Sequence, residues 1–255
     1  MVLAFVAMFG LMFGSFLNVC IYRLPRSQSI VMPRSHCVKC NHLITWYENI
    51  PVLSYIFLLG KCSVCKDKIS LVYPIVEILT AVMAVLLYMF FGPSVKTVIY
   101  FVLFSSLIVA TFIDFERQEI PDIITLPGIV LGLLTVVIYP ELLGKGRMDA
   151  IVDSLIGILV GGGSLYAIGF LGEIVFKKEA MGGGDIKLLA MVGAFMGWEL
   201  TLVTFFLAPI FGSLAGIIAK IKEGKELIPY GPYLSLAAFI SLLCGRDIIR
   251  FMFPY

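Results

Sequence analysis

The stretch Met181-Gly-Gly-Gly-Asp185 joins a glycine run to an acidic residue, and the apolar stretch Ile186 to Trp198 follows it directly. An ionised carboxylate is expensive at membrane depth, so an acid at the edge of an apolar run indicates a functional site. Consecutive glycines carry no Cβ and permit positive φ, which would let another peptide backbone lie close against this loop. Asp185 is therefore the first candidate for chemistry. The alternative is a flexible loop in which Asp185 caps the following helix.

Composition places this chain among membrane proteins. Its mean hydropathy is +1.02, 60% of its residues are hydrophobic and only 14% are charged, whereas about a quarter of the residues in a soluble domain are charged. A transmembrane helix needs about 20 predominantly apolar residues, or fewer where protein shields it. The sequence therefore predicts an all-α polytopic membrane protein with about eight transmembrane helices, near residues 2–22, 71–91, 97–113, 123–139, 151–172, 186–198, 200–219 and 232–252.

The placement of positive residues predicts the orientation in the membrane. The first loop carries Arg23, Arg26, Arg34, Lys39, Lys61, Lys66 and Lys68, and later loops on the same side carry Lys177, Lys178, Lys220, Lys222 and Lys225. The intervening loops carry fewer, such as Lys145 and Arg147. The positive-inside rule then puts the long loop in the cytoplasm and both termini outside. The net charge of +2 says little about partners, and we expect the lipid bilayer but no nucleic acid among them.

A second acid lies at the end of another apolar run, in Phe112-Ile-Asp114-Phe-Glu-Arg-Gln-Glu-Ile-Pro-Asp122. Asp114 and Asp185 both fall on the predicted cytoplasmic side and form a pair. Two carboxylates held close together cannot both ionise easily, so they share a proton, and one acts as base on water while the other acts as acid. This is the chemistry of an aspartic protease. Asp122 follows Pro121 at a predicted helix N-terminus, where we expect it to have a structural role.

Residues 23–70 differ sharply from the rest of the chain because charges, prolines and polar residues replace the apolar runs. They predict a small cytoplasmic insert between a first transmembrane helix, residues 1–22, and a membrane domain with the peptidase site, residues 71–255. Two C-x-x-C pairs in the insert predict a structural zinc ion held by four thiolates, from Cys37, Cys40, Cys62 and Cys65. Disulfides are the alternative, although a cytoplasmic loop is a reducing setting. His36 and His42 are alternative ligands.

Several further residues carry weaker signals. Cys20 and Cys244 lie in apolar runs and are predicted to be small buried hydrophobes. Glu77 lies one turn inside the second predicted helix and needs a partner, either a structural one such as Arg23 or a substrate or cofactor. Lys187 either pairs with a substrate carboxylate, tunes the acid pair, or extends to the interface as an ordinary lysine.

Glycines within two apolar runs predict close helix contacts. Gly10 and Gly14 have the small-xxx-small spacing that lets helix backbones approach each other. The run Gly161-Gly-Gly163 predicts the same in the fifth span.

Four motifs, taken together and in order, resemble those of bacterial type IV prepilin peptidases over nearly the whole chain. They are Gly14-Ser-Phe-Leu-Asn-Val-Cys-Ile-Tyr-Arg-Leu-Pro25, the four paired cysteines, the Asp114 to Asp122 stretch and Gly182-Gly-Gly-Asp185-Ile-Lys187. Pro229-Tyr-Gly-Pro232 also resembles an element of this family, and its role does not follow from the residues.

The resemblance implies a bifunctional enzyme of the bacterial inner membrane. Such an enzyme cleaves the basic leader peptide of type IV prepilins or pseudopilins at the cytoplasmic face, with Asp114 and Asp185 as the catalytic pair. It then methylates the new N-terminal residue with S-adenosylmethionine. Glu48 and Asn49, in the aromatic and acidic cluster Trp46 to Pro51, are the contacts that we expect for this methyl donor, and a solvated turn is the alternative.

Three other interpretations remain open at this point. A peptidase without methyltransferase activity is the nearest, and the long cysteine-bearing loop argues against it. An ion-coupled transporter would also place paired acids within membrane spans. A binding module on a membrane scaffold would leave both aspartates unexplained. The sequence does not select between pili, competence and type II secretion, nor does it give the oligomeric state.

Overall fold

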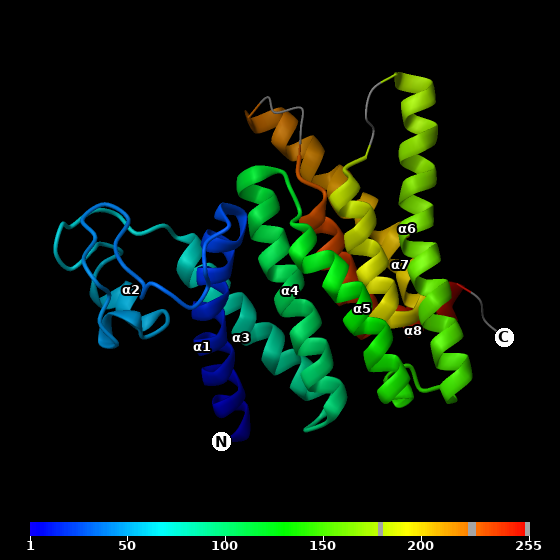
Figure 1. Ribbon diagram of the computed structural model, residues 1–255, viewed down its shortest axis with the longest axis horizontal. Coiled ribbons are helices and arrows are strands. Elements are labelled where there is room, and N and C mark those ends of the chain that lie inside the picture. The colour runs from blue at the N-terminus through cyan, green and yellow to red at the C-terminus, as the bar shows by residue number, and fades with distance from the viewer. Residues whose placement is uncertain (178–180, 224–227, 253–255) are drawn as a thin grey trace. The chain divides into compact units, whose positions relative to one another are not determined.

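The computed structural model describes residues 1–177, 181–223 and 228–252. Lys178 and Lys225, two of the lysines used to predict orientation, lie outside these ranges. The helices are α1 (Val2–Arg23), η1 (Leu24–Arg26), η2 (Tyr47–Asn49), α2 (Leu53–Phe57), α3 (Val72–Phe91), α4 (Val95–Arg117), α5 (Asp122–Ile138), η3 (Pro140–Leu142), α6 (Arg147–Phe176), α7 (Gly183–Glu223) and α8 (Gly231–Met252) (Figure 1). Within the described residues, the only β-type pairing is two isolated bridges, so the all-α prediction holds.

Five of the described helices are long and apolar enough to cross a membrane: α1, α3, α4, α6 and α7. The shorter helix α5 is also apolar. Every one of the eight predicted ranges falls on a helix, but the count of eight spans is not confirmed. The ranges 186–198 and 200–219 share the label α7 but are two helices, separated at a kink where Gly197 has the non-helical angles φ 75° and ψ 174°.

The chain folds into two compact units, Met1–Val109 and Ala110–Tyr255. In the first unit α1 packs on α3, and the predicted glycine contact explains how. A Cβ at Gly10 would lie 2.6 Å from the Cα of Ala81, and one at Gly14 would lie 2.7 Å from the Cα of Glu77. Asn18 adds a polar contact, since its side-chain amide donates to the carbonyl of Tyr73 at 3.0 Å.

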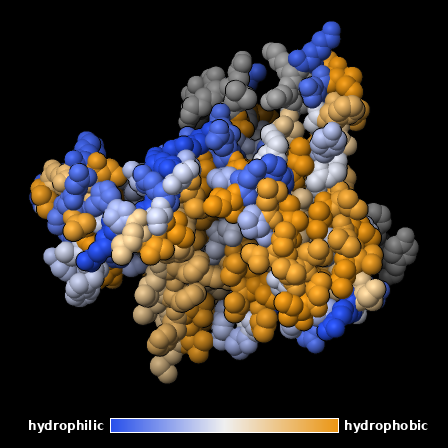
Figure 2. Space-filling model, in the orientation of Figure 1, coloured by the Kyte–Doolittle hydropathy of each residue, from blue (hydrophilic) through white to orange (hydrophobic). Residues whose placement is uncertain are grey.

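The second unit contains the end of α4 and the helices α5 to α8. Helices α6 and α7 approach closely where Gly157 faces Gly193 and where Gly161 faces the backbone of Leu189. The prediction for the glycine run was wrong at Gly163, because no described atom lies within 4 Å of the position its Cβ would take. Figure 2 shows hydrophobic side chains covering the visible faces of α5 and α6, as expected for surfaces in contact with lipid.

The two cysteines predicted to be buried hydrophobes differ. Cys20, on α1, is 7% exposed, which agrees with the prediction. Cys244, on α8, is exposed, so the prediction was wrong for this residue. An apolar run shows that a segment avoids water, but it does not show which face of the helix meets protein and which meets lipid.

Candidate functional site

Asp114 lies near the end of α4 and is 5% exposed. Its Oδ2 accepts a hydrogen bond from the backbone N–H of Gly231 at 2.9 Å. Gly231 is the first residue of α8, and the N–H groups of a first helical turn have no partner within their own helix, so they favour an anionic acceptor. A Cβ at Gly231 would lie 2.8 Å from this oxygen. Glycine is therefore what allows the backbone to reach the carboxylate, and this gives the Pro229 to Pro232 element a role that its sequence did not show.

Asp185 lies in the first turn of α7, within the same unit as Asp114. Its side chain is half-buried and lies within reach of the electrostatic field of Asp114. Among the described residues, its Oδ1 is a buried acceptor with no hydrogen-bond partner. Buried acceptors are normally paired, so this oxygen is available to a ligand or to a shared proton. The structure thus brings together the two acids that the sequence predicts as a pair.

The glycines before Asp185 have different surroundings. A Cβ at Gly184 would lie 2.8 Å from the Cβ of Ile120, whose Cδ1 would be 3.0 Å from a Cβ at Gly231. Ile120 therefore packs against both Gly184, which precedes Asp185, and Gly231, which binds Asp114. No described atom comes within 4 Å of a Cβ position at Gly183. Another peptide backbone therefore has room to approach the chain at this glycine.

Lys187 pairs with Asp122, and this contact was not foreseen in the sequence. The Lys187 ammonium lies 2.6 Å and 2.9 Å from the two carboxylate oxygens of Asp122, which is the first residue of α5. Both side chains are partly exposed, so the pair contributes little to stability. Its effect is geometric, because it ties the N-terminus of α5 to the turn of α7 that carries Asp185. The structure therefore agrees with a structural role for Asp122.

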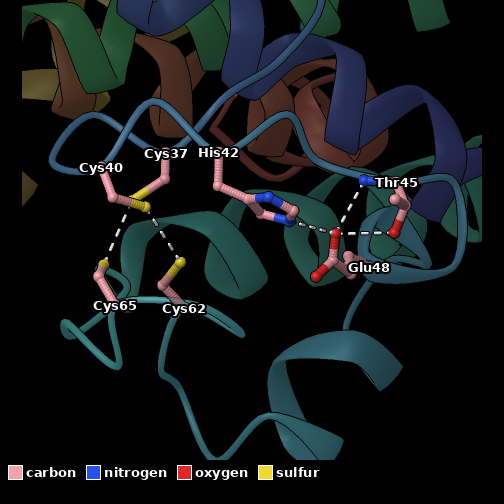
Figure 3. Close-up of polar contacts among 7 residues, drawn as sticks. All are labelled: Cys37, Cys40, His42, Thr45, Glu48, Cys62 and Cys65. Atoms are coloured by element: carbon pink, nitrogen blue, oxygen red, sulfur yellow. Dashed lines mark hydrogen bonds and ion pairs between the residues drawn. The ribbon is translucent and has the colours of Figure 1, made fainter.

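The four cysteines of the insert form one cluster, with all four sulfur atoms within 4.8 Å of one another. The closest cross-pairs are Cys37 with Cys65 at 3.8 Å and Cys40 with Cys62 at 3.9 Å (Figure 3). These separations are far longer than the about 2.05 Å of a disulfide. They suit four thiolates around one tetrahedral ion, whose bonds to sulfur are about 2.3 Å long.

Each C-x-x-C pair sits on the same kind of turn, so the cluster is built from two copies of one motif. The N–H of Asn41 donates to the carbonyl of Cys37 at 2.9 Å, and that of Lys66 donates to Cys62 at 3.1 Å. Asn41 and Lys66 both take positive φ, 55° and 60°. An antiparallel bridge closes each turn, between His36 and Leu43 in the first and between Lys61 and Lys68 in the second. This local repeat was missed in the sequence.

The two histidines have partners outside the cysteine cluster. His36 Nδ1 lies 3.2 Å from the carbonyl oxygen of Arg34, and His42 Nε2 lies 3.2 Å from Glu48 Oε2. The same Glu48 oxygen accepts from the N–H and the hydroxyl of Thr45, at 2.8 Å and 2.7 Å (Figure 3). Hydrogen bonds from Ser63, Thr45 and His42 lower the pKa of Glu48 to about 2. Glu48 is therefore a fixed anion that joins the first cysteine turn to the segment after it.

Glu77 has a structural partner, but this partner is not Arg23, which the sequence suggested as one candidate. Its Oε2 accepts from the N–H of Val52 at 2.8 Å, and Val52 has φ 61°, which is strained for a β-branched residue. Arg23 instead donates to the carbonyls of Ser29 and Pro33, at 2.8 Å and 2.6 Å. Glu77 thus anchors the start of α2 to helix α3, and the first of the two predicted roles, a structural one, describes it.

Comparison with known proteins follows the same division of the chain. Residues 8–91 match the model of the bacterial peptidase A24 N-terminal domain, and residues 101–217 match that of the type IV leader peptidase family. Relatives named prepilin leader peptidase/N-methyltransferase include one from Pseudomonas putida, 36% identical over 94% of this chain and 89% of its own length. The Aeromonas salmonicida relative is 37% identical over 96% and 91%. No solved structure matches. With relatives this similar over nearly its full length, the chain belongs to the type IV leader peptidase family.

Proposed function

We propose that this protein cleaves the basic leader from type IV prepilins and pilin-like proteins at the cytoplasmic membrane face, and then methylates the new N-terminal residue. The observation that carries the proposal is the pair of acids at two helix ends, Asp114 and Asp185, in a chain of this family. The placement of basic residues supports an inner-membrane protein of about eight spans, with both termini outside and the site facing the cytoplasm.

The acid pair supplies the chemistry of hydrolysis. One carboxylate takes a proton from water as the oxygen attacks the scissile carbonyl, and the other carboxyl donates its proton to the departing amine. The hydrogen bond from the Gly231 N–H holds the Asp114 carboxyl group in place. An extended substrate backbone fits the open side of the loop at Gly183, since a helix would hide the scissile carbonyl.

Methylation consumes the product of cleavage. Hydrolysis releases an α-amine whose ordinary pKa near 8 leaves a neutral fraction that can attack a methyl group. S-adenosylmethionine supplies that methyl group when bound. The four cysteines fit a structural zinc ion, because their chemistry, number and mutual distances are those of a closed tetrahedral site. The ordered double turn of this insert favours the two-activity enzyme over a peptidase alone, and family membership argues against the transporter.

The experiment that tests the function is incubation of the purified protein with a prepilin, with and without S-adenosylmethionine. Intact-mass spectrometry should show loss of the leader in both samples and the gain of a methyl group only with the methyl donor. An unchanged prepilin mass in both samples would contradict the peptidase. Cleavage without any methyl gain would leave a peptidase alone.

Cleavage must come before methylation, and this order can be tested with a variant that cannot cleave. The Asp185→Asn protein should neither cleave nor methylate an intact prepilin, because the α-amine is never exposed. The same protein should methylate a pre-cleaved pilin at the wild-type rate, measured by transfer of a labelled methyl group. If it fails on the pre-cleaved pilin while still folded and able to bind the methyl donor, then the two sites do not act separately.

Gly231→Ala should lower the rate of cleavage by about a hundredfold, because the new methyl group would displace the Asp114 carboxylate from its backbone donor. The matched control is Gly163→Ala, which adds the same group where no described atom is in contact. Single-turnover cleavage assays on both variants make the comparison. Equal rates for Gly231→Ala and the wild type would show that the Gly231 contact does not position Asp114.

A further inference from the structure

A cavity of about 310 Å³ lies where the last turns of α1 meet the insert. Its walls come from α1 and from two segments of the insert, namely Val19, Arg23, Ile30, Val31, Pro33, Arg34, Ser35, Ile44, Thr45, Trp46 and Asn49. Its volume lies at the lower end of the range for small-molecule pockets, about 300 to 1,000 Å³. Asn49 lines it, whereas Glu48 binds His42 and Thr45.

We propose that this cavity binds the methyl donor, and that the four-cysteine centre holds one of its walls in place. The proposal rests on the methyltransferase activity proposed above and adds a location for the donor. A nucleoside with a sulfonium and an amino-acid end needs three kinds of contact. These are a flat apolar surface for the purine, a polar group for its edge, and a cation for the carboxylate.

Two arginines supply the cation. Arg23 is only 7% exposed, and its two terminal nitrogens are held by the carbonyls of Ser29 and Pro33. Its guanidinium is thus fixed in the wall, and it has five N–H donors in all. Arg34 is an exposed residue of the same lining. A carboxylate between a fixed and a mobile arginine makes charge-assisted hydrogen bonds, which are the stronger kind.

Trp46 and Asn49 supply the other two contacts. The Trp46 side chain is 77% exposed, although its residue lines the cavity, and the Tyr47 ring supports it edge-on at a centroid distance of 5.8 Å. An exposed tryptophan face offers stacking to a purine and attraction to a sulfonium cation. The Asn49 side-chain amide both donates and accepts hydrogen bonds, as the edge of adenine requires.

A chain of contacts connects the cavity to the cysteine cluster. Thr45 lines the cavity, and its N–H and hydroxyl both donate to Glu48. Glu48 in turn contacts His42, two residues after Cys40 (Figure 3). The Glu48 side chain is 9% exposed, so these bonds are shielded from water. Release of the metal would free the first cysteine turn and, through His42 and Glu48, the wall that Thr45 forms.

Charge argues against the leader peptide as the occupant. The proposed leader is basic, and the two arginines would repel it, whereas the methyl donor also has a carboxylate that the arginines attract. An anionic lipid headgroup would use the arginines but offers no ring for Trp46. The occupant that we propose is therefore the nucleoside, and the experiment must distinguish its binding from that of a lipid.

The test uses the full-length protein in detergent and S-adenosylhomocysteine, the donor without its methyl group. The chain has two tryptophans, so Trp198→Phe leaves Trp46 as the only indole reporter. Binding should change Trp46 fluorescence, and calorimetry should give one site per chain. Arg34→Ala and Asn49→Ala should each weaken binding by about tenfold at unchanged zinc content, whereas Arg147→Ala, an exposed arginine on α6, should not.

Different results would contradict the cavity as the site of the methyl donor and the methyltransferase activity itself. Wild-type binding that Arg34→Ala and Asn49→Ala leave unchanged would overturn the cavity as the site while the methyltransferase stands. A wild-type protein that neither binds S-adenosylhomocysteine nor methylates a pre-cleaved pilin would overturn the proposed activity itself. A Trp46 response to phosphatidylglycerol vesicles, with none to S-adenosylhomocysteine, would assign the cavity to lipid and overturn the inference.

Discussion

Asp114→Asn and Asp185→Asn should each lower leader cleavage by about a thousandfold or more, because an amide can neither take the proton from water nor pass one to the departing amine. Both changes keep the size of the side chain. At position 114 the amide oxygen can still accept from the Gly231 N–H, as Asp114 Oδ2 does, so the protein should remain folded. Single-turnover cleavage of a prepilin measures the effect, and size-exclusion profiles and melting temperatures confirm the fold.

Asp122→Asn is the matched control, since it makes the same chemical change to a nearby acid. It weakens the partly exposed pair with Lys187, which is worth little energy, so cleavage should fall by no more than about tenfold. Wild-type cleavage by the Asp114 or Asp185 variant would remove that residue from the pair. A loss at Asp122 as large as at the other two would show that the Lys187 contact is essential to the geometry.

The acid pair and the cysteine cluster could be predicted because each has a local sequence signature. An acid at the end of an apolar run is costly, so its presence alone is informative. The two C-x-x-C pairs likewise have a spacing that few other purposes require. Neither prediction needed the path of the chain, because the acids were predicted to lie on the same side of the membrane and the cysteines lie in the same insert, which limits their separation.

Gly231 could not be predicted in the same way. Its contact with Asp114 joins residues 117 positions apart in the sequence, and the donor is a backbone N–H that every residue except proline possesses. Only the space for a Cβ distinguishes this position, and that space depends on the packing of α4 and α8. The same holds for Glu48, whose partners follow from the fold of the cysteine turns and not from its own chemistry.

The number of spans also depends on a feature that hydropathy does not register. Gly197 lies at the kink between the two helices of α7, and a Cβ there would lie 2.6 Å from Oδ2 of Asp153. The Lys145 ammonium lies 2.9 Å from the same carboxylate. A charged pair packs against this kink, so the two apolar helices that the sequence predicts follow each other without a polar loop and share the label α7.

Cys37→Ser combined with Cys40→Ser should remove the metal and abolish methyl transfer. Two thiolate ligands are lost, and a structural zinc site contributes much of the folding free energy of a small segment that has little apolar core. The wall formed by Thr45 would then lose its support through His42 and Glu48, and the binding of S-adenosylhomocysteine should fall below detection. Leader cleavage should survive in part, since Asp114 and Asp185 belong to the other unit.

Elemental analysis of protein purified without added metal should give close to one zinc per chain for the wild type and none for the double variant. Cys244→Ser is the matched control, because Cys244 is exposed on α8, far in the sequence from the cluster, and should keep both zinc and methyl transfer. Wild-type protein with four reduced cysteines and no zinc would contradict the metal site. Full methyl transfer by the metal-free double variant would instead break the proposed connection between the cluster and the cavity, because a wall that persists without the metal does not depend on it.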